Sequence, residues 1–350
     1  MSALSRIDLA EVCRRHANIV AISLLIPLLF FFGCTDLTEF ELPYSGALYI
    51  LSPDDFSVIT KISSIPEARS LLVYPDGLLI ATTRGMIHNY SLDSYDLIGE
   101  YTVGSPSPAG YMQMTYSSIE ETAYLIGSMG KLLEIDLPEC EVLDEFSVCQ
   151  SPVEFVVPDN SSYIYVCDGP SNRLYQLSIE NNSPYTSVPV YFTIHCLEPG
   201  QNPDSMLMGT SRGINLVEIL APGVLRNTIQ NEPVPCIALA AVPSDTVFIG
   251  VKGYPGDYSV GVVDVINSQV HIPPLPEYYG QVGLTGNFHF LSIATDSTHA
   301  FVLSSNGESA SRLVSYNYST YTIDQQIDLQ GFPLDLEVSE DGIIFALTAK

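Results

Sequence analysis

Short apolar runs alternate with small polar clusters along most of the chain after residue 45. In the clearest stretch, from Leu71 to Gly104, the runs are Leu71–Tyr74, Leu78–Thr82, Met86–Leu92 and Asp96–Val103. Each is rich in leucine, β-branched or aromatic residues and is bounded by Gly, Pro, Asp or Ser, which is typical of strands separated by turns. This stretch therefore predicts four short strands.

The same pattern returns along the chain, and an acidic residue marks the turn between the first two strands of each unit. These residues are Asp76, Glu120, Asp159, Asp204, Asp245, Asp296 and Asp341. Successive positions are 39 to 51 residues apart, and a period of about 40–45 residues with four strands per repeat is that of a β-propeller blade. Aspartate at this place is explained by hydrogen bonds to the local backbone.

The two ends of the repeat region complement each other. The last unit stops after two strands at Lys350, and two further strands, Ala47–Leu51 and Phe56–Ile62, precede the first unit. An open propeller would leave costly unpaired edges. We therefore predict an all-β fold over residues 46–350, a single seven-bladed β-propeller of four-stranded antiparallel blades, closed by N-terminal strands that complete the C-terminal blade.

One unit indicates a family. Residues 161–179, SSYIYVCDGPSNRLYQLSI, resemble the YVTN-type repeat, with Tyr165-Val166-Cys167-Asp168 in the YVTN place. The strand that follows this place ends at Asp136 in the second unit and at Asp264 in the fifth. The resemblance covers roughly residues 46–350, and such repeats occur in bacterial surface and periplasmic propellers and in the lactonase-like superfamily. The chain contains no tryptophan, which excludes the WD signature and argues against a tryptophan-docked pyrroloquinoline quinone propeller.

An apolar run near the N-terminus predicts export. It spans Ala17–Phe32, follows Arg14 and Arg15, and contains Pro27. Its 16 residues are short for a membrane-spanning helix, which needs about 20, and match the apolar core of an export signal. An uncleaved membrane anchor and a buried core helix are the alternatives.

The end of this run resembles the lipobox of bacterial lipoproteins. Gly33-Cys34 follows the apolar core, and in that family the matching cysteine is lipidated and becomes the mature N-terminus. The resemblance implies a signal peptide over 1–33, a tether over 34–45, lipidation at Cys34, and an exported chain anchored by this lipid at the periplasmic or cell-surface face of the bacterial cell envelope.

The excess of acidic over basic residues limits the kinds of partner that the protein can bind. The chain has 13 Lys and Arg against 40 Asp and Glu, and removal of residues 1–33 leaves 10 against 38, a net charge of −28. Nucleic acid and anionic lipid both need a basic face, so we expect no nucleic-acid partner. The 46% apolar and 15% charged content favours a folded domain over a disordered one.

The mature cysteines are odd in number and have no CxxC spacing, which excludes zinc ribbons, redox pairs and haem attachment. They are Cys140, Cys149, Cys167, Cys196 and Cys236. One or two disulfides remain open, but we expect buried thiols that act as small hydrophobes. No EF-hand loop, HExxH or dinucleotide fingerprint is present, so we expect no cofactor and no metal.

Two short motifs are interpreted as turns. Gly209–Gly213 matches GxSxG, but a nucleophile elbow needs a helix after the strand, and this segment lies between two predicted strands. Gly127–Lys131 resembles a phosphate loop, but its glycine spacing is wrong and a strand follows where helix amides are required.

Polar residues on first strands mark the central channel as one candidate site. Arg69, Gln113 and the set His195, Glu154, His289 and Asp335 fall on these strands. Converging carboxylates and histidines can act as acid and base or hold a metal. This set would be the catalytic site of a lactonase-like hydrolase, whereas the plain alternative is an ordinary water-filled polar channel.

The longest interval, from Asp245 to Asp296, contains two insertions, Lys252–Ser259 and Pro273–Gly286. The first insertion lies in the loop between the second and third strands of its blade, and the second lies in the loop between blades. In a propeller these two loops emerge on the same face. Tyrosine side chains there would give a large contact area with a polar tip. The candidate ligand contacts are Tyr254, Asp257, Tyr258, Glu277, Tyr278 and Tyr279. The alternative is a rigid proline-rich spacer without a ligand.

Two functional hypotheses follow. The first is a non-enzymatic envelope lipoprotein whose propeller is a docking platform for a protein or glycan partner. The second is a lactonase-like hydrolase with its site in the central channel, because propellers host both kinds of function.

Overall fold

The computed structural model describes residues 44–350, apart from 105–110, 128, 138, 159–160, 180–182, 191, 200–204, 222–223, 228–235, 242–245, 253–257, 265–268, 272–290, 306–309, 318 and 321. The chain separates into two compact units, Met1–Glu41 and Leu42–Lys350. Every described residue belongs to the second unit, so the predicted signal peptide, Cys34 and most of the predicted tether lie outside the described residues. No helix among the described residues is long and apolar enough to cross a membrane.

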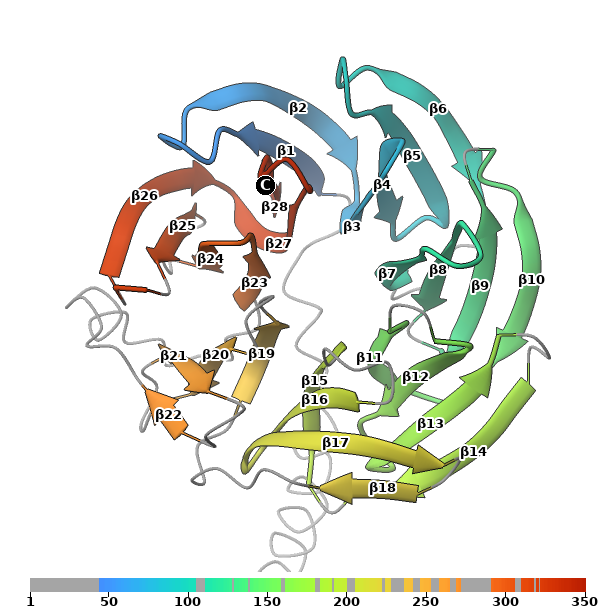
Figure 1. Cartoon of the computed structure of the whole chain (residues 1–350). Helices are drawn as coiled ribbons and strands as arrows, with labels where there is room; N and C mark the ends of the chain where they lie inside the picture. Colours follow the sequence, from blue (N-terminus) through green and yellow to red (C-terminus); the bar gives the residue numbers. More distant parts are fainter. Residues whose placement is uncertain are drawn as a thin grey trace, which may run out of the picture. The chain divides into compact units, whose positions relative to one another are not determined.

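The second unit is built from 28 strands that pair into four-stranded antiparallel sheets (Figure 1). The innermost strands are β3 (Ala68–Tyr74), β7 (Tyr111–Ser117), β11 (Pro152–Val156), β15 (Ile194–Pro199), β19 (Cys236–Ala241), β23 (Leu291–Thr295) and β27 (Phe332–Val338). The second strands are β4 (Gly77–Thr82), β8 (Thr122–Gly127), β12 (Tyr163–Asp168), β16 (Ser205–Thr210), β20 (Thr246–Lys252), β24 (His299–Ser305) and β28 (Ile344–Ala349).

The third strands are β5 (Met86–Ser91), β9 (Lys131–Asp136), β13 (Arg173–Ser178), β17 (Gly213–Ala221), β21 (Tyr258–Asp264), β25 (Ala310–Asn317) and β1 (Ser45–Leu51). The outermost strands are β6 (Leu97–Thr102), β10 (Val142–Ser147), β14 (Ser183–Pro189), β18 (Val224–Asn227), β22 (Gln269–His271), β26 (Thr322–Gln330) and β2 (Val58–Pro66).

Six blades consist of four consecutive strands, rather than the seven expected from the repeat count. The remaining strands come from the two ends of the chain and form one further four-stranded sheet, in the order β2-β1-β28-β27. In this composite sheet β1 pairs with β28 from Gly46 opposite Ala349 to Leu51 opposite Ile344. The N-terminal strands therefore cover the edge that the C-terminal hairpin would otherwise leave open.

The innermost strands contact one another in a closed cycle. Each of β3, β7, β11, β15, β19 and β23 contacts the next one along the chain, and β27 contacts β3. Successive sheets are thus neighbours around a common centre, as Figure 1 shows for the strands of this unit. This arrangement is a β-propeller.

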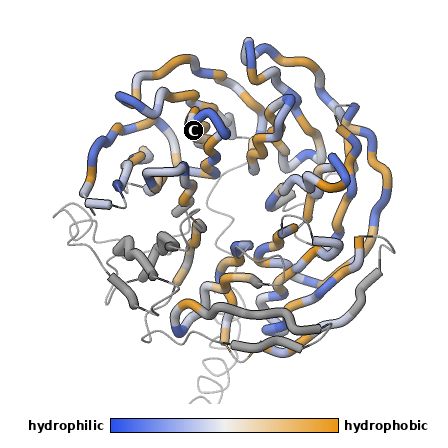
Figure 2. Tube along the Cα trace, in the orientation of Figure 1, coloured by the Kyte–Doolittle hydropathy of each residue, from blue (hydrophilic) through white to orange (hydrophobic). Residues whose placement is uncertain are grey.

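The core lies in layers between successive sheets. All six residues of β4, β8 and β28 are buried, because these strands have a neighbouring sheet on both faces. One layer joins Leu79 and Ile87 of one sheet to Leu125 and Leu133 of the next, and Figure 2 shows apolar residues along these middle strands. Full burial of such a side chain contributes about 1.5–3 kcal/mol to the free energy of folding. The apolar layers between sheets therefore stabilise the ring.

The predicted strand bounds need small corrections. The strand expected over Phe56–Ile62 is β2, which begins at Val58 because Phe56 has a left-handed backbone (φ 56°) and belongs to the preceding turn. The strand expected over Asp96–Val103 is β6 and ends at Thr102. A left-handed backbone is unusual for a bulky residue such as phenylalanine and is typical of turns, and the sequence pattern does not reveal it.

Glu67 connects the composite sheet to the first blade. Its backbone N–H donates to the Tyr44 carbonyl at 3.1 Å, and its carbonyl accepts the Thr83 N–H at 3.0 Å. Its buried carboxylate accepts Arg84 Nε at 2.9 Å, Arg84 Nη2 at 2.7 Å and Thr83 Oγ1 at 2.5 Å. These bonds hold its pKa below the ordinary value. A charge-assisted network of this kind positions the chain where the composite sheet meets β3.

Deletion of residues 47–62 is expected to cause aggregation or a large fall in the melting temperature. The deletion exposes the edge of β28 and removes Leu48, Ile50 and Leu51, which are completely buried. The measurement is size-exclusion chromatography with thermal unfolding. The control Ser63→Asp changes an exposed position of β2 and should alter stability by no more than about 0.5 kcal/mol. A deleted protein that stays monomeric with unchanged melting would contradict this account of closure.

Candidate functional site

The innermost strands carry an irregularity at one repeated place. Except in β23, the register with the second strand shifts near the start of the strand, and one residue is left unpaired in the ladder. The residues that resume pairing after this bulge are Ser70, Gln113, Glu154, Cys196, Ala238 and Asp335. These residues are structurally equivalent although their distances from the turn acids differ, because the turns have different lengths.

Three of these equivalent residues bond to the next sheet in the ring. Asp335 Oδ2 accepts the backbone N–H of Leu71 at 2.8 Å. Gln113 Oε1 accepts that of Phe155 at 2.9 Å, and Glu154 Oε2 accepts that of Leu197 at 3.2 Å. In each case the donor is the residue just after the equivalent position on the neighbouring strand. A bulge disrupts the ladder locally, and a buried N–H needs an acceptor, so these side chains link adjacent sheets.

Hydrogen bonds of Gln113 and Glu154 form a continuous network across three sheets. Gln113 Nε2 donates to Glu154 Oε1 at 2.9 Å, while the other oxygen of Glu154 accepts the Leu197 N–H. Both carboxyl oxygens of Glu154 are therefore engaged. Asp335 is similar, because its Oδ1 accepts the N–H of Leu336 at 2.9 Å. These contacts connect β7 through β11 to β15, and β27 to β3.

The carboxyl groups at the centre have raised pKa values. Burial, with smaller contributions from Glu198 and Asp335, raises the pKa of Glu154 to about 8. Burial also raises the pKa of Asp335 to about 6, against hydrogen bonds and the charge of Arg69. The pKa of Glu337 lies well above its ordinary value because of burial and the nearby charges of Asp335 and Glu198. The innermost strands therefore bring four acidic side chains into electrostatic range of one another.

The positive charge of Arg69 lowers the pKa of Asp335, one of these acidic groups. Burial lowers the pKa of Arg69 from the ordinary value, and the charges of Tyr44 and Asp335 oppose that change. Burial also raises the pKa of Tyr44 to about 12, and its hydroxyl donates to the Ala68 carbonyl at 2.6 Å. Among the described residues, the centre of the ring is thus an acidic region beside one half-buried guanidinium, that of Arg69.

Three of the four residues predicted to form a catalytic site in the channel lie in the described part of the chain. Glu154, His195 and Asp335 lie on the innermost strands β11, β15 and β27, as expected, and His195 is half-buried. His289 lies outside the described residues. In the part of the chain that the structure describes, no group of three or more His, Cys, Asp or Glu side chains is arranged to hold a metal ion.

Sequence reasoning missed Glu198 and Glu337. Each lies two residues after an equivalent position, Cys196 or Asp335, and alternate residues of a strand face the same way. Alignment of the innermost strands on their bulges would have found them. Alignment on the turn acids did not.

The predicted ligand-contact set lies mostly outside the described residues. Tyr258 is the first residue of β21 and pairs with Lys252 of β20. The other five positions, Tyr254, Asp257, Glu277, Tyr278 and Tyr279, fall in 253–257 and 272–290, which the structure does not describe. The assignment of this set to ligand binding therefore stays a prediction.

Both short motifs are turns, as predicted. Gly209–Gly213 joins β16 to β17, where Thr210 Oγ1 donates to the Gly213 carbonyl at 2.9 Å and accepts the Arg212 N–H at 3.1 Å. Gly130 joins β8 to β9 with a φ of 69°, and a Cβ there would lie 1.8 Å from the Cys149 carbonyl oxygen. Glycine is therefore required by the backbone at this turn.

The five cysteines in the part of the chain that the structure describes are free thiols. Four are buried and Cys149 is half-buried, which confirms the expectation of small buried hydrophobes for most of them. Burial raises the pKa of the Cys140 thiol to about 11 and that of Cys149 to about 12. Neither thiol has the lowered pKa of a reactive cysteine.

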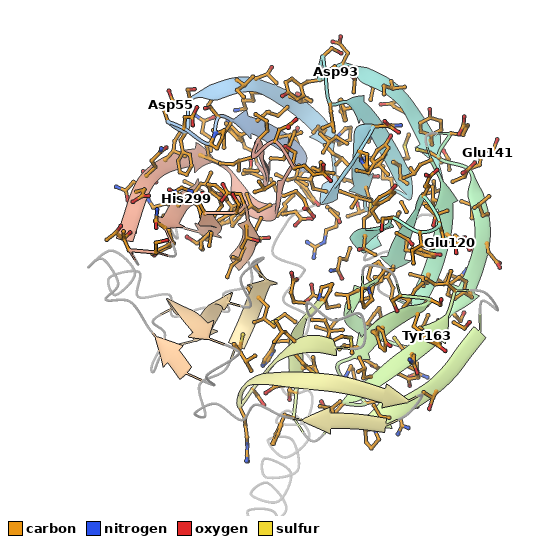
Figure 3. All side chains as sticks on the ribbon, in the orientation of Figure 1. Asp55, Asp93, Glu120, Glu141, Tyr163 and His299 are labelled. Atoms are coloured by element: carbon orange, nitrogen blue, oxygen red, sulfur yellow. The ribbon has the colours of Figure 1, made fainter. Side chains whose placement is uncertain are left out.

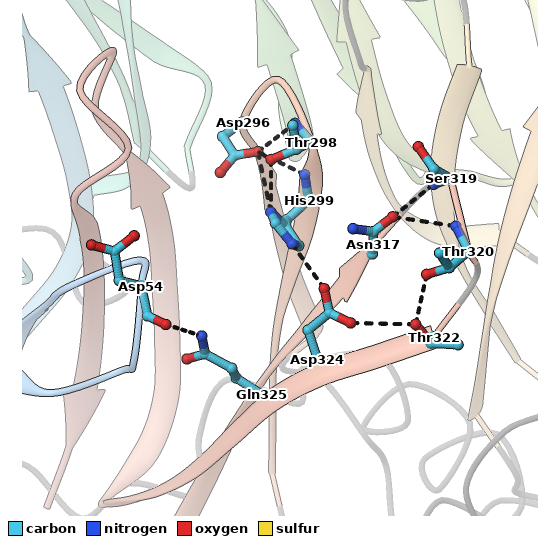
Figure 4. A network of polar contacts seen from close by, with 10 residues as sticks. All are labelled: Asp54, Asp296, Thr298, His299, Asn317, Ser319, Thr320, Thr322, Asp324 and Gln325. Atoms are coloured by element: carbon cyan, nitrogen blue, oxygen red, sulfur yellow. Dashed lines mark hydrogen bonds and ion pairs between the residues drawn. The ribbon is translucent and has the colours of Figure 1, made fainter.

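A polar network on the sheet β23–β26 has the residue types of a catalytic triad (Figure 4). Thr298 Oγ1 lies 2.8 Å from His299 Nδ1, and His299 Nε2 lies 3.0 Å from Asp324 Oδ2. Asp296 Oδ1, however, accepts the N–H groups of Thr298 and His299, each at 2.6 Å, and the Thr298 hydroxyl at 3.1 Å. The arrangement closes a turn, which confirms the predicted backbone role of the turn aspartate at Asp296.

A separate contact from the same strand reaches the composite sheet. Gln325 of β26 donates a hydrogen bond to the backbone carbonyl of Asp54, in the turn before β2 (Figure 4). This contact joins the outer strand of one sheet to the next sheet and adds to the closure at the core.

Comparisons with solved structures show the fold. No family model matches the chain, and no curated protein matches it. The structure titled "Structure of U3-55K" is 12% identical, with a TM-score of 0.62 over 86% of this chain and 98% of that one. "Crystal structure of RRP9 WD40 repeats" is 12% identical, with a TM-score of 0.62 over 87% and 97%.

A third similar structure, "Kuenenia stuttgartiensis Hydrazine Synthase", is 11% identical, with a TM-score of 0.65 over 81% of this chain and 95% of that one. At this level of identity the likeness concerns the fold alone. The comparisons and the strand arrangement agree that the chain is a β-propeller.

The stability of the protein is expected to fall as the pH rises from about 5 to about 9. A carboxyl whose folded pKa is raised, such as Glu154 at about 8 against an ordinary 4.5, contributes its full stability below the unfolded value and loses it as the pH rises through the folded value. Glu154→Gln should flatten the dependence of the melting temperature on pH by roughly 2 °C or more, since one pKa unit is 1.36 kcal/mol.

The matched control is Glu120→Gln, which changes an exposed turn residue and should keep the wild-type slope. Thermal unfolding at a series of pH values measures both variants. An unchanged slope in Glu154→Gln would show that this carboxyl is not held protonated in the folded state.

Proposed function

We propose that this protein is a non-enzymatic lipoprotein whose β-propeller serves as a docking platform for a protein or glycan partner in the cell envelope. The β-propeller fold is compatible with a binding platform. The apolar run Ala17–Phe32 followed by Gly33-Cys34 supports the envelope part of the proposal, because it matches an export signal with a lipidation cysteine.

One observation carries the preference for a platform over an enzyme. Glu154 and Asp335, the central acidic side chains in the predicted catalytic set, each accept a backbone N–H from the neighbouring inner strand. Their other oxygens accept the side-chain amide of Gln113 and the backbone N–H of Leu336. A general acid or base must have an oxygen within hydrogen-bond reach of a substrate proton. Carboxyl groups engaged in this way stabilise the ring, and a rigid ring suits a docking surface.

A hydrolase with its site in the channel is the second candidate. Its support is that the pKa of Glu154 is about 8 and that of Asp335 about 6, because an acid–base catalyst works best with a pKa near the operating pH.

Lipidation is tested by Cys34→Ala. The variant should lose labelling by a fatty-acid probe and accumulate as an unprocessed precursor, because the lipid is attached to the thiol of this residue. Metabolic labelling followed by mass spectrometry of the N-terminus measures both effects, and Cys13→Ala in the predicted signal is the matched control. Equal labelling of Cys34→Ala and the wild type would remove the lipoprotein part of the proposal.

The working region is tested by two sets of substitutions. Replacement of Tyr254, Tyr258, Tyr278 and Tyr279 with serine should weaken capture of envelope partners by about tenfold or more, because clustered tyrosines often carry much of an interface's energy. Melting should change little, since substitutions at surface positions usually alter stability by no more than about 0.5 kcal/mol each.

The double variant His195→Ala with His289→Ala tests the alternative, in which the site lies in the central channel. This set should leave partner capture unchanged. Loss of function in the histidine set with full function in the tyrosine set would place the site in the channel and favour the hydrolase.

A further inference from the structure

Three neighbouring sheets repeat the same turn before their outermost strand. The Ser52 N–H donates to the Ser57 carbonyl at 3.0 Å, and the equivalent bonds join Ser91 to Asp96 at 3.0 Å and Asp136 to Glu141 at 2.9 Å. Each turn holds one left-handed residue, which is Phe56, Tyr95 or Cys140, with φ of 56°, 59° and 54°. The three turns therefore present the residues that follow them in the same way.

Two exposed apolar side chains follow each of these turns. They are Val58 and Ile59 at the start of β2 (46% and 48% exposed), Leu97 and Ile98 of β6 (47% and 56%), and Val142 and Leu143 of β10 (40% and 54%). Single exposed apolar residues are ordinary on protein surfaces. Pairs repeated at one equivalent place on three successive outer strands indicate an interaction surface.

The same turns are acidic. Each holds two exposed acidic residues just before the apolar pair: Asp54 and Asp55, Asp93 and Asp96, or Glu139 and Glu141. Figure 3 shows Asp55, Asp93 and Glu141 one after another along the outer margin of the three sheets. We call these six acidic residues and the three apolar pairs the acidic–apolar rim.

One described sheet lacks this pattern. β26, the outermost strand of the sheet preceding the composite sheet, begins with Thr322 and Ile323, and the described residues just before it, Asn317, Ser319 and Thr320, are not acidic. Since the sheet β23–β26 lacks it, the pattern is not a general consequence of the repeat.

We propose that the acidic–apolar rim docks a basic amphipathic segment of a partner protein, with Lys or Arg facing the turn acids and apolar residues on the three apolar pairs. Charge complementarity supports this chemistry, because the rim gathers six of the acidic groups of a chain whose net charge is −27. The same charge disfavours a second copy of this chain, nucleic acid and anionic lipid. The inference deepens the proposed docking function, on which it rests, by naming a surface and a partner chemistry.

The size of the rim sets the length of the segment. Packed sheets lie about 10 Å apart and propeller blades diverge outward, so three outer strands span at least about 20 Å. A helix rises 1.5 Å per residue, so a helical partner needs roughly 14 residues or more. Outer strands also have a free edge, and the acidic residues beside it oppose pairing with a second copy.

The test uses the full chain and a fluorescein-labelled 15-residue peptide of leucine and lysine with its leucines at helical spacing. Fluorescence anisotropy should show binding of this peptide, while matched leucine–glutamate and serine–lysine peptides should bind at least about tenfold more weakly, because each lacks one of the two required features. Equal binding of the leucine–glutamate peptide would overturn the charge assignment.

Two variants locate the binding. Ile59→Thr with Ile98→Thr and Leu143→Thr removes apolar contact, and Asp54→Asn with Asp93→Asn and Glu141→Gln removes charge. Each triple variant should weaken peptide binding by about tenfold, and the second should also reduce its salt dependence. Because all six positions are exposed, the melting temperature should stay near that of the wild type.

Matched controls remove the same features elsewhere. Met129→Thr changes an apolar side chain that is 69% exposed in the turn between β8 and β9. Glu120→Gln with Glu340→Gln and Asp341→Asn removes three exposed acids from turns between first and second strands. These controls should keep wild-type binding within about twofold.

Unchanged binding in both rim variants would overturn the proposal. Sedimentation velocity adds a further outcome, because a wild-type dimer that the threonine variant abolishes would assign the rim to a second copy and would also overturn it. Neither result depends on lipidation of Cys34 or on the tyrosine set, so failure of the rim and failure of the envelope proposal are distinguishable.

Discussion

The pairing of β1 with β28 is the constraint on which the rest of the structure depends. It joins residues about 300 positions apart, with Leu48 opposite Leu347 and Ile50 opposite Phe345. Each sheet in the ring has a neighbour on both faces only if this pairing forms, and burial of the middle strands depends on those neighbours. Closure therefore converts a linear repeat, which would expose two unpaired edges, into a single cooperative core.

The centre of the ring is organised by a second constraint, the bulge near the start of the innermost strands. A bulge leaves backbone groups that the ladder does not satisfy, and Gln113, Glu154 and Asp335 supply acceptors to the next sheet. Burial of acidic groups for this purpose is costly, which appears as raised pKa values for Glu154 and Asp335. The polar residues on the innermost strands thus have a structural role in linking adjacent sheets.

The outer strands are free of both constraints. Their residues alternate between exposed and half-exposed positions in β6 and β10, as the mixed hydropathy of these strands in Figure 2 illustrates. Since the ring is held together from within, side chains at the outer turns can vary without loss of the fold. A propeller fold does not specify a function, so surface chemistry of this kind is where functional differences between propellers arise.

The sequence by itself determined the propeller fold and most of its strands, because turn residues and apolar runs recur with a period of about 40–45 residues. It did not reveal that Phe56 belongs to a turn, since a left-handed backbone leaves no mark in the hydrophobic pattern. Only the tertiary structure decided that Gln113, Glu154 and Asp335 are equivalent, because turns of unequal length hide the common bulge. The acidic–apolar rim was likewise decided by tertiary structure, since its three turns are distant in sequence and become neighbours only when successive sheets pack around the closed ring.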